Sequence, residues 1–138
     1  MMCLSRLKNH EGWGLLVLRL VLGYIFILHG LEKWSLWDMT ASEQMSEGML
    51  NLFRLLSIVE PLGGLALILG FLTRWASLGL GIIMVGAIYF KMSVWGVPFA
   101  AQNATGWEFD LVLLAAFVSL MFTGAGHIAL DRMMCKKK

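Results

Sequence analysis

The sequence alternates between long apolar runs and short polar stretches. Four runs are long enough to cross a bilayer, approximately residues 14–34, 50–72, 75–97 and 107–130. A helix needs about 20 apolar residues to cross the hydrocarbon core, whereas a membrane barrel would need shorter segments of alternating hydrophobicity. The pattern therefore predicts an all-α integral membrane protein, with a four-helix bundle formed by a single domain over residues 1–138.

Aromatic and basic residues mark the ends of the four runs. The six tryptophans lie at or just beyond the run ends, as in an aromatic belt: Trp13, Trp34, Trp37, Trp75, Trp95 and Trp107. Seven basic residues are assigned to one side of the membrane, namely Arg6, Lys8, Arg74, Arg132 and Lys136 to Lys138, against Lys33, Arg54 and Lys91 on the other. Because cytoplasmic loops carry the excess of Lys and Arg, we expect both termini in the cytoplasm of a bacterial inner-membrane protein.

Composition agrees with a lipid environment. Hydrophobic residues make up 59% of the chain and charged residues only 14%, with a mean hydropathy of +0.75. A soluble domain carries roughly 25% charged residues. These values exclude disorder, and a net charge of +2 leaves no basic stripe for nucleic acid. We expect Cys3 and Cys135 to be free cytoplasmic thiols, since neither belongs to a Cys-x-x-Cys motif.

Small residues recur at spacings of four and seven within the runs. The pairs are Ala66/Gly70, Ser77/Gly81, Ala115/Ser119, Gly23/Gly30, Gly63/Gly70 and Gly79/Gly86. Such stripes let helices approach closely in lipid, where the hydrophobic effect no longer drives their association. They predict a tight bundle, and faces left uncovered would suit a homo-oligomer or another membrane subunit.

Glu60 is the most deeply placed ionisable residue, near the middle of the second run. Pro61 follows it and removes the backbone donor that the Ser57 carbonyl would use, and Gly63 and Gly64 come next. An intramembrane acid is costly and marks a functional site by default. We expect a kinked helix opening a polar cavity, the alternative being a packing kink with a protonated, hydrogen-bonded glutamic acid.

One face of the first run combines charged ends with small residues. It carries Arg19, Gly23, Phe26, Gly30 and Lys33, with His29 at its margin. The glycines would admit a neighbouring helix or a flat ligand. Arg19 either snorkels to lipid phosphate or pairs with Glu60. His29 is either a hydrogen-bond donor between helices or, with Glu60, a proton carrier at a site.

The fourth run carries two acids on nearly opposite faces, Glu108 and Asp110. We expect Glu108 to face the interior because its face also holds Ala115 and Ser119. Lys91 and Asp110 are expected to be interfacial anchors. A metal bound by His29, Glu60 and Glu108 has no supporting local spacing, so no metal site is predicted.

The order of these motifs resembles the DoxX family of small bacterial inner-membrane proteins. The residues that carry the resemblance are Arg19, Gly23, Phe26, Gly30 and Lys33; Glu60 to Gly64, Gly70, Thr73 and Arg74; Gly106 to Glu108; Gly124 to Gly126; and Leu130 and Asp131. The resemblance implies four membrane helices with both termini inside. It also carries over Arg19, Gly30, Lys33, Glu60, Gly63, Gly64, Arg74 and Glu108 as family positions.

The resemblance implies a role in membrane redox chemistry. Family members include the quinone-linked subunit of thiosulfate:quinone oxidoreductase and proteins tied to sulfur, oxidative-stress or quinone-detoxification functions. We therefore expect a quinone-interacting subunit, with Glu60 and His29 as proton carriers and the Arg19 face, Gly63, Gly64 and Glu108 around the quinone. The chain carries no haem, flavin or iron–sulfur motif, so a partner would supply electrons. The alternatives are a non-catalytic membrane scaffold and a small proton-coupled transporter.

Overall fold

The computed structural model describes residues 10–42, 45–102 and 105–135, and this part of the chain is helical with no strand. A lone β-bridge joins Ser42 and Met45. The helices are α1 (Glu11–Glu32), the 3₁₀ helix η2 (Lys33–Trp37), α2 (Glu47–Leu69), α3 (Thr73–Ser93), α4 (Trp107–Thr123) and α5 (Leu130–Cys135). Several residues named in the topology and thiol predictions lie outside the described residues: Cys3, Arg6, Lys8 and Lys136 to Lys138.

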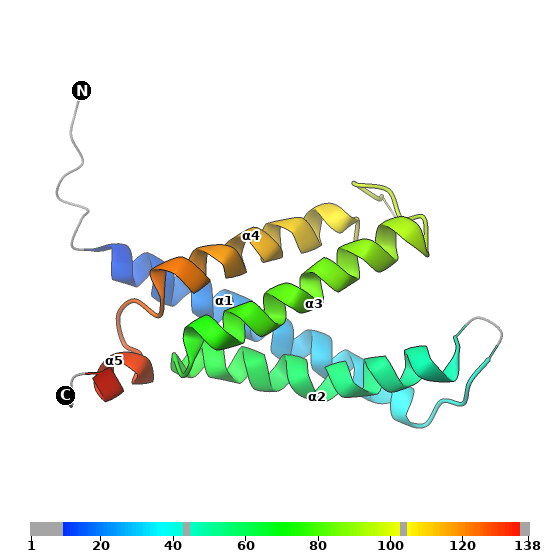
Figure 1. Cartoon of the computed structure of the whole chain (residues 1–138), viewed down its shortest axis with the longest axis horizontal. Coiled ribbons are helices and arrows are strands. Elements are labelled where there is room, and N and C mark those ends of the chain that lie inside the picture. Colours follow the sequence, from blue (N-terminus) through cyan, green and yellow to red (C-terminus); the bar gives the residue numbers. More distant parts are fainter. Residues whose placement is uncertain (1–9, 43–44, 103–104, 136–138) are drawn as a thin grey trace.

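Helices pair in the order of the sequence. Helix α1 packs along α2, and α3 packs along α4, with the short α5 at the end where α3 begins (Figure 1). The backbone N–H of His127 donates to the Gly12 carbonyl at 3.2 Å. The two ends of the described chain therefore lie at the same end of the molecule.

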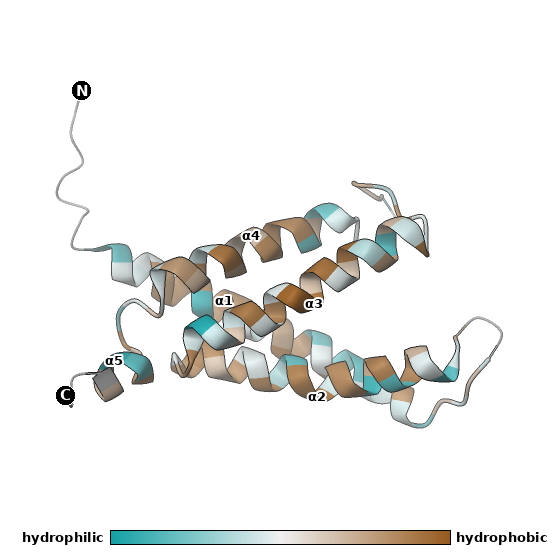
Figure 2. Cartoon of the chain, in the orientation of Figure 1, coloured by the Kyte–Doolittle hydropathy of each residue, from teal (hydrophilic) through white to brown (hydrophobic). Residues whose placement is uncertain are grey.

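Among the described residues, three helical segments are long and apolar enough to cross a membrane: Glu11–Trp37, Glu47–Leu69 and Thr73–Ser93. Figure 2 shows the apolar residues running along these helices, with hydrophilic residues gathered towards the helix ends. Helix α4 has 17 residues, fewer than the about 20 that a crossing needs. The protein is thus a membrane protein that is helical, without strands, over its described residues, and the fourth crossing and the cytoplasmic termini stay predictions.

Helices α2 and α4 end earlier than the predicted runs, in each case at a glycine that leaves the helical conformation. Helix α2 ends at Leu69 because Gly70 adopts a left-handed conformation with φ of 66°. Helix α4 ends at Thr123, seven residues before the predicted end at residue 130. Gly124 and Gly126 have φ of 81° and 70°, which residues with a Cβ rarely adopt. The prediction followed hydropathy alone, and the loop after α4 is itself apolar.

Glycines bring α1 and α2 into backbone contact. A Cβ added at Gly64 would lie 2.6 Å from the Gly23 carbonyl oxygen, and one added at Gly30 would collide with the ring of Pro61. Close approach of this kind is the main source of helix association in lipid. The tight packing predicted from the glycine spacing is confirmed for this pair of helices.

Pro61 leaves one carbonyl of α2 without its helical donor, as predicted, and η2 supplies the replacement. The Trp34 indole N–H donates to the Ser57 carbonyl at 3.2 Å. The Trp37 indole N–H donates to the Ser57 hydroxyl at 3.0 Å. The 3₁₀ turn after α1 is therefore fastened to α2 at the residue that the proline deprives of its partner.

The buried core is built by all four long helices. Its members are Leu22, Phe26, Leu67, Leu80, Met84, Leu113, Phe117 and Leu120. The rings of Phe26 and Phe117 meet edge to face, with centroids 5.1 Å apart. This core joins the α1–α2 pair to the α3–α4 pair and leaves a separate space between α2 and α3.

Candidate functional site

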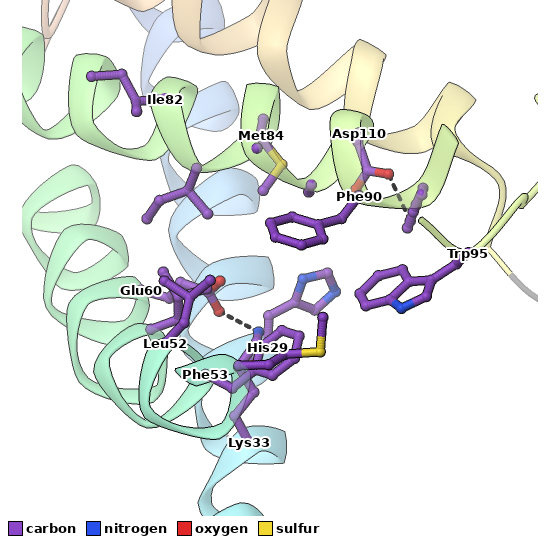
Figure 3. A pocket seen from close by; sticks show the side chains of 16 residues that line it. His29, Lys33, Leu52, Phe53, Glu60, Ile82, Met84, Phe90, Trp95 and Asp110 are labelled. Atoms are coloured by element: carbon purple, nitrogen blue, oxygen red, sulfur yellow. Dashed lines mark hydrogen bonds and ion pairs between the residues drawn. The ribbon is translucent and has the colours of Figure 1, made fainter. Parts of the chain in front are cut away.

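A cavity of about 430 Å³ lies between α2 and α3. Its lining residues are His29, Lys33, Met49, Leu52, Phe53, Leu56, Glu60, Ile82, Ile83, Met84, Gly86, Ala87, Phe90, Lys91, Trp95 and Asp110. Most of these residues are apolar, and the ionisable ones come from α1, η2, α2, α3 and α4. Figure 3 shows how several of them lie around the space. Leu52 is 39% exposed and Ile82 64% exposed, so the walls continue onto the lipid-facing surface of the helices.

The first ion pair of the cavity joins Lys33 and Glu60. The Lys33 ammonium lies 2.6 Å from a Glu60 carboxylate oxygen and also donates to the His29 carbonyl at 2.9 Å. The Glu60 side chain is 4% exposed and that of Lys33 21%. A cavity thus lies beside Glu60, but most of its lining residues are apolar and Pro61 is not among them, so the expectation of a polar cavity opened by the proline is not met. The partner of Glu60 is Lys33, so the alternative that paired it with Arg19 is wrong.

The second ion pair joins Lys91 of α3 and Asp110 of α4. Their charged atoms are 2.6 Å apart, and their side chains are 18% and 7% exposed. The prediction that these two residues are separate interfacial anchors is wrong, because they neutralise each other within the protein. Two buried ion pairs in an apolar space carry a large desolvation cost. A cost of this kind marks an intramembrane site as a candidate for function.

Aromatic rings surround the space between the two ion pairs. Phe53 of α2 stacks on Trp95 with centroids 6.4 Å apart and planes at 16°, and Trp95 also contacts Phe90. The His29 imidazole packs near the rings of Phe26 and Phe109, and it makes no hydrogen bond within the described part of the chain. Flat aromatic rings and an imidazole without a hydrogen bond among the described residues thus face the same cavity (Figure 3).

Arg19 lies elsewhere, fully buried against backbone carbonyls. Its guanidinium donates to the carbonyls of Leu67, Ala125, His127, Ile68 and Ile128. The hydrogen bond to the Leu67 carbonyl measures 2.9 Å and that to the Ile128 carbonyl 3.0 Å. Arg19 therefore ties the C-terminal end of α2 to the loop between α4 and α5. Its side chain neither snorkels nor lines the cavity.

The remaining residues predicted on the first and second runs serve packing. Phe26 belongs to the core. Gly23, Gly30 and Gly64 hold α1 against α2, and Gly63 lies against Leu80 of α3. Of the predicted site residues, the structure brings His29, Lys33 and Glu60 together in the cavity. Their chemical roles stay predictions.

The expected orientation of α4 is wrong. Asp110 is 5% exposed and faces the cavity, whereas Glu108 is exposed. The choice of Glu108 rested on Ala115 and Ser119, whose small side chains were taken to mark the inner face. The buried positions of α4 are instead Asp110, Leu113, Phe117 and Leu120. Glu108 and Glu60 are therefore apart, and the described residues contain no group of three or more His, Cys, Asp or Glu that could hold a metal.

Sequence reasoning missed Lys91, Asp110 and the aromatic residues Phe53, Phe90 and Trp95 as members of one site. The available signal was the opposite charges of Lys91, near the C-terminal end of its predicted span, and Asp110, near the N-terminal end of the next. Those two ends lie on the same side of the membrane when consecutive spans cross it in opposite directions. The spacing of the buried leucines and Phe117 on α4 would have placed Asp110 on the inner face.

Comparison with known proteins places the chain in a family. The sequence model of the DoxX family matches residues 14–93. A Bacillus subtilis protein named "Putative oxidoreductase CatD" is 32% identical over 127 residues, which cover 91% of this chain and 90% of that protein. The chain belongs to the DoxX family. The DoxX match spans α1 to α3 and thus every cavity-lining residue except Trp95 and Asp110.

Other DoxX relatives carry membrane names. The Escherichia coli "Inner membrane protein YqjF" is 30% identical over 95% of this chain and 99% of its own length. The Mycobacterium tuberculosis "Uncharacterized membrane protein Rv3486" is 29% identical over 96% of this chain and 88% of its own length. No solved structure matches the chain significantly. The names agree with the membrane-crossing helices of the structure.

Proposed function

We propose that the protein is a quinone-interacting subunit of an oxidoreductase complex in the bacterial inner membrane. The observation that carries the proposal is the cavity between α2 and α3, with its apolar walls, aromatic rings and two ion pairs. The name of the Bacillus subtilis relative supports an oxidoreductase, and that of the Escherichia coli relative supports the inner membrane.

The cavity fits the chemistry of a quinone. Binding sites for such ligands combine mainly apolar walls with a few polar groups that fix orientation. Phe53, Phe90 and Trp95 offer flat surfaces for a ring. Lys33 and Lys91 come from η2 and α3, and each would donate a hydrogen bond to one carbonyl oxygen of the ring.

The mouth of the cavity suits a ligand that arrives from the bilayer. Exposed apolar side chains of α2 and α3, among them Leu52 and Ile82, continue its walls outwards. An isoprenoid tail would lie along this surface while the ring entered between the helices. A water-soluble substrate would gain nothing from such a path.

In this proposal Glu60 and His29 carry protons. Conversion of a quinone to a quinol consumes electrons, which a partner subunit would supply, and protons, which the protein must deliver at the carbonyl oxygens. Glu60 lies beside Lys33, and His29 adjoins the same space with no hydrogen bond among the described residues. A proton carrier needs to be within hydrogen-bond reach of the atom that it serves, and both side chains line the cavity.

Quinone content tests this function. Protein purified in mild detergent is extracted with solvent, and quinone per mole of protein is measured by chromatography. Glu60→Gln removes the charge that orients Lys33, so we expect bound quinone to fall roughly tenfold, since a hydrogen bond to a charged group contributes about 1.5–3 kcal/mol.

Glu108→Gln is the matched control, because Glu108 is an exposed acid outside the cavity. Its quinone content should equal that of the wild type. Thermal unfolding of all three proteins separates ligand loss from misfolding. A quinone-free wild type, or equal content in Glu60→Gln and wild type, would refute the proposal, and reproducible co-purification of unrelated membrane proteins would then favour a scaffold.

A further inference from the structure

A second hollow, of about 560 Å³, lies at the end of the molecule where α3 begins and α4 ends. Its lining residues are Leu72, Arg74, Trp75, Thr123, Gly124, Ala125, Gly126, Asp131, Arg132 and Met134. It shares no residue with the cavity between α2 and α3. Two of its side chains, Arg74 and Arg132, are cationic.

Both arginines retain unused donors. Arg74 has one long hydrogen bond, 3.4 Å to the Phe122 carbonyl, and Arg132 has one to the His127 ring nitrogen at 2.8 Å. A guanidinium has five N–H donors. Within the described part of the chain the only ion pairs are those of Lys33 and Lys91, so neither arginine of this hollow has a carboxylate partner.

The single acid of the hollow is committed elsewhere. Both carboxylate oxygens of Asp131 accept backbone N–H groups at the start of α3, from Leu72 at 2.7 Å and from Thr73 at 2.8 Å. Its negative charge therefore serves the helix terminus. The hollow keeps an excess of positive charge with free donors.

The position of the hollow fits a lipid phosphate. Helix α3 is long and apolar enough to cross a membrane and begins at Thr73, which would place its first turn at the boundary of the hydrocarbon. Trp75, which is 70% exposed, stands beside the arginines, as an aromatic residue at a membrane interface does. We propose that this hollow binds the phosphate headgroup of an anionic phospholipid, held by Arg74 and Arg132 with Trp75 against the acyl-chain region.

Lipid selectivity tests the site. Delipidated full-length protein is titrated with phosphatidylglycerol or phosphatidylcholine, and bound lipid is counted by native mass spectrometry. We expect the wild type to prefer phosphatidylglycerol. Arg74→Gln and Arg132→Gln should each reduce that preference about fivefold, in line with the contribution of one basic residue near an anionic surface. The double variant should show no preference.

Arg54→Gln is the control, since Arg54 lies near the far end of α2 and donates to Leu36, Trp37, Met39 and Asn51. Its lipid preference should match that of the wild type. Equal binding of both lipids by the wild type, an unchanged preference in the double variant or an equal loss in Arg54→Gln would overturn the proposal. Competition by millimolar inorganic phosphate as effective as that by phosphatidylglycerol would overturn it too, because the ligand would then be a soluble anion.

Discussion

At the scale of single residues, Arg19 shows how a charge can be buried in an apolar protein without an ion-pair contact to a carboxylate of the described residues, although Asp131 is near enough to act on it electrostatically. Its guanidinium is 0% exposed and faces carbonyl groups from α2 and from the loop after α4. Carbonyls at the C-terminal end of a helix carry partial negative charge, and those of Leu67 and Ile68 lie in the last turn of α2. The charge is thus stabilised by several dipoles together.

Arg19→Met should therefore destabilise the protein strongly. Methionine retains the apolar stem but leaves the carbonyls of Leu67, Ala125 and Ile128 without their donor. We expect a loss of about 3 kcal/mol in the free energy of unfolding, measured by detergent titration in mixed micelles. Arg54→Met, at a partly exposed arginine that also bonds carbonyls, should cost less than half of this. Equal losses of unfolding free energy in the two variants would show that the burial of Arg19 adds nothing to its stabilising effect.

The pairing of side chains with one another was the feature that could be predicted least well from the sequence. Depth along a run identified Glu60 and the Pro61 signal identified the free carbonyl of Ser57, because both follow from helix geometry alone. The Lys33–Glu60 pair and the hydrogen bonds from Arg19 to backbone carbonyls depend on how the helices are shifted along their axes relative to one another. The residue pattern within one helix does not specify that shift. On α4, small residues were read as the inner face, whereas in lipid they can equally lie outside.

At the scale of helices, α1 and α2 form a unit that glycine makes possible. Gly23 meets Gly64, Gly30 meets Pro61, and η2 then folds back onto Ser57. The cavity inherits its geometry from this contact, because Lys33 and Glu60 face each other only while the two helices remain in register.

Gly23→Ala should force α1 and α2 apart. The added methyl group would meet the Gly64 carbonyl oxygen and the Ile68 side chain, both 2.5 Å away. We expect a loss of about 1–3 kcal/mol in the free energy of unfolding and a weaker hold on any cavity ligand. Gly79→Ala is the matched control, since nothing lies within 4 Å of its added Cβ. Its stability should be unchanged or up to about 1 kcal/mol higher, and an equal loss in both variants would contradict close packing at Gly23.

At the scale of the whole molecule, both ends of the described chain meet at one end of the bundle. Trp13 packs near His127, with ring centroids 5.9 Å apart, and Asp131 caps α3. Hydropathy located the membrane-crossing helices, and the order of motifs indicated the family. Hydropathy overestimated the length of α4, because the glycines after Thr123 end the helix within an apolar stretch.

The positive-inside count gives a topology that thiol labelling can test. A membrane-impermeant maleimide applied to spheroplasts should label neither Cys3 nor Cys135, because both are predicted in the cytoplasm. Ser42→Cys, in the exposed segment between η2 and α2, should be labelled readily. Labelling of native cysteines before lysis, or protection of the cysteine at 42, would reverse the orientation.

The backbone carbonyls that accept hydrogen bonds from Arg19 also have a consequence for synthesis of the chain. The arginine emerges from the ribosome with the first helix, yet three of its acceptors, on Ala125, His127 and Ile128, are translated 106 to 109 residues later. A nascent or truncated chain that stops before Ala125 leaves this guanidinium only partly matched inside the membrane. The guanidinium therefore gains its full set of acceptors only after Ala125 to Ile128 have been translated, and we expect a chain truncated before Ala125 to be degraded faster than the full chain.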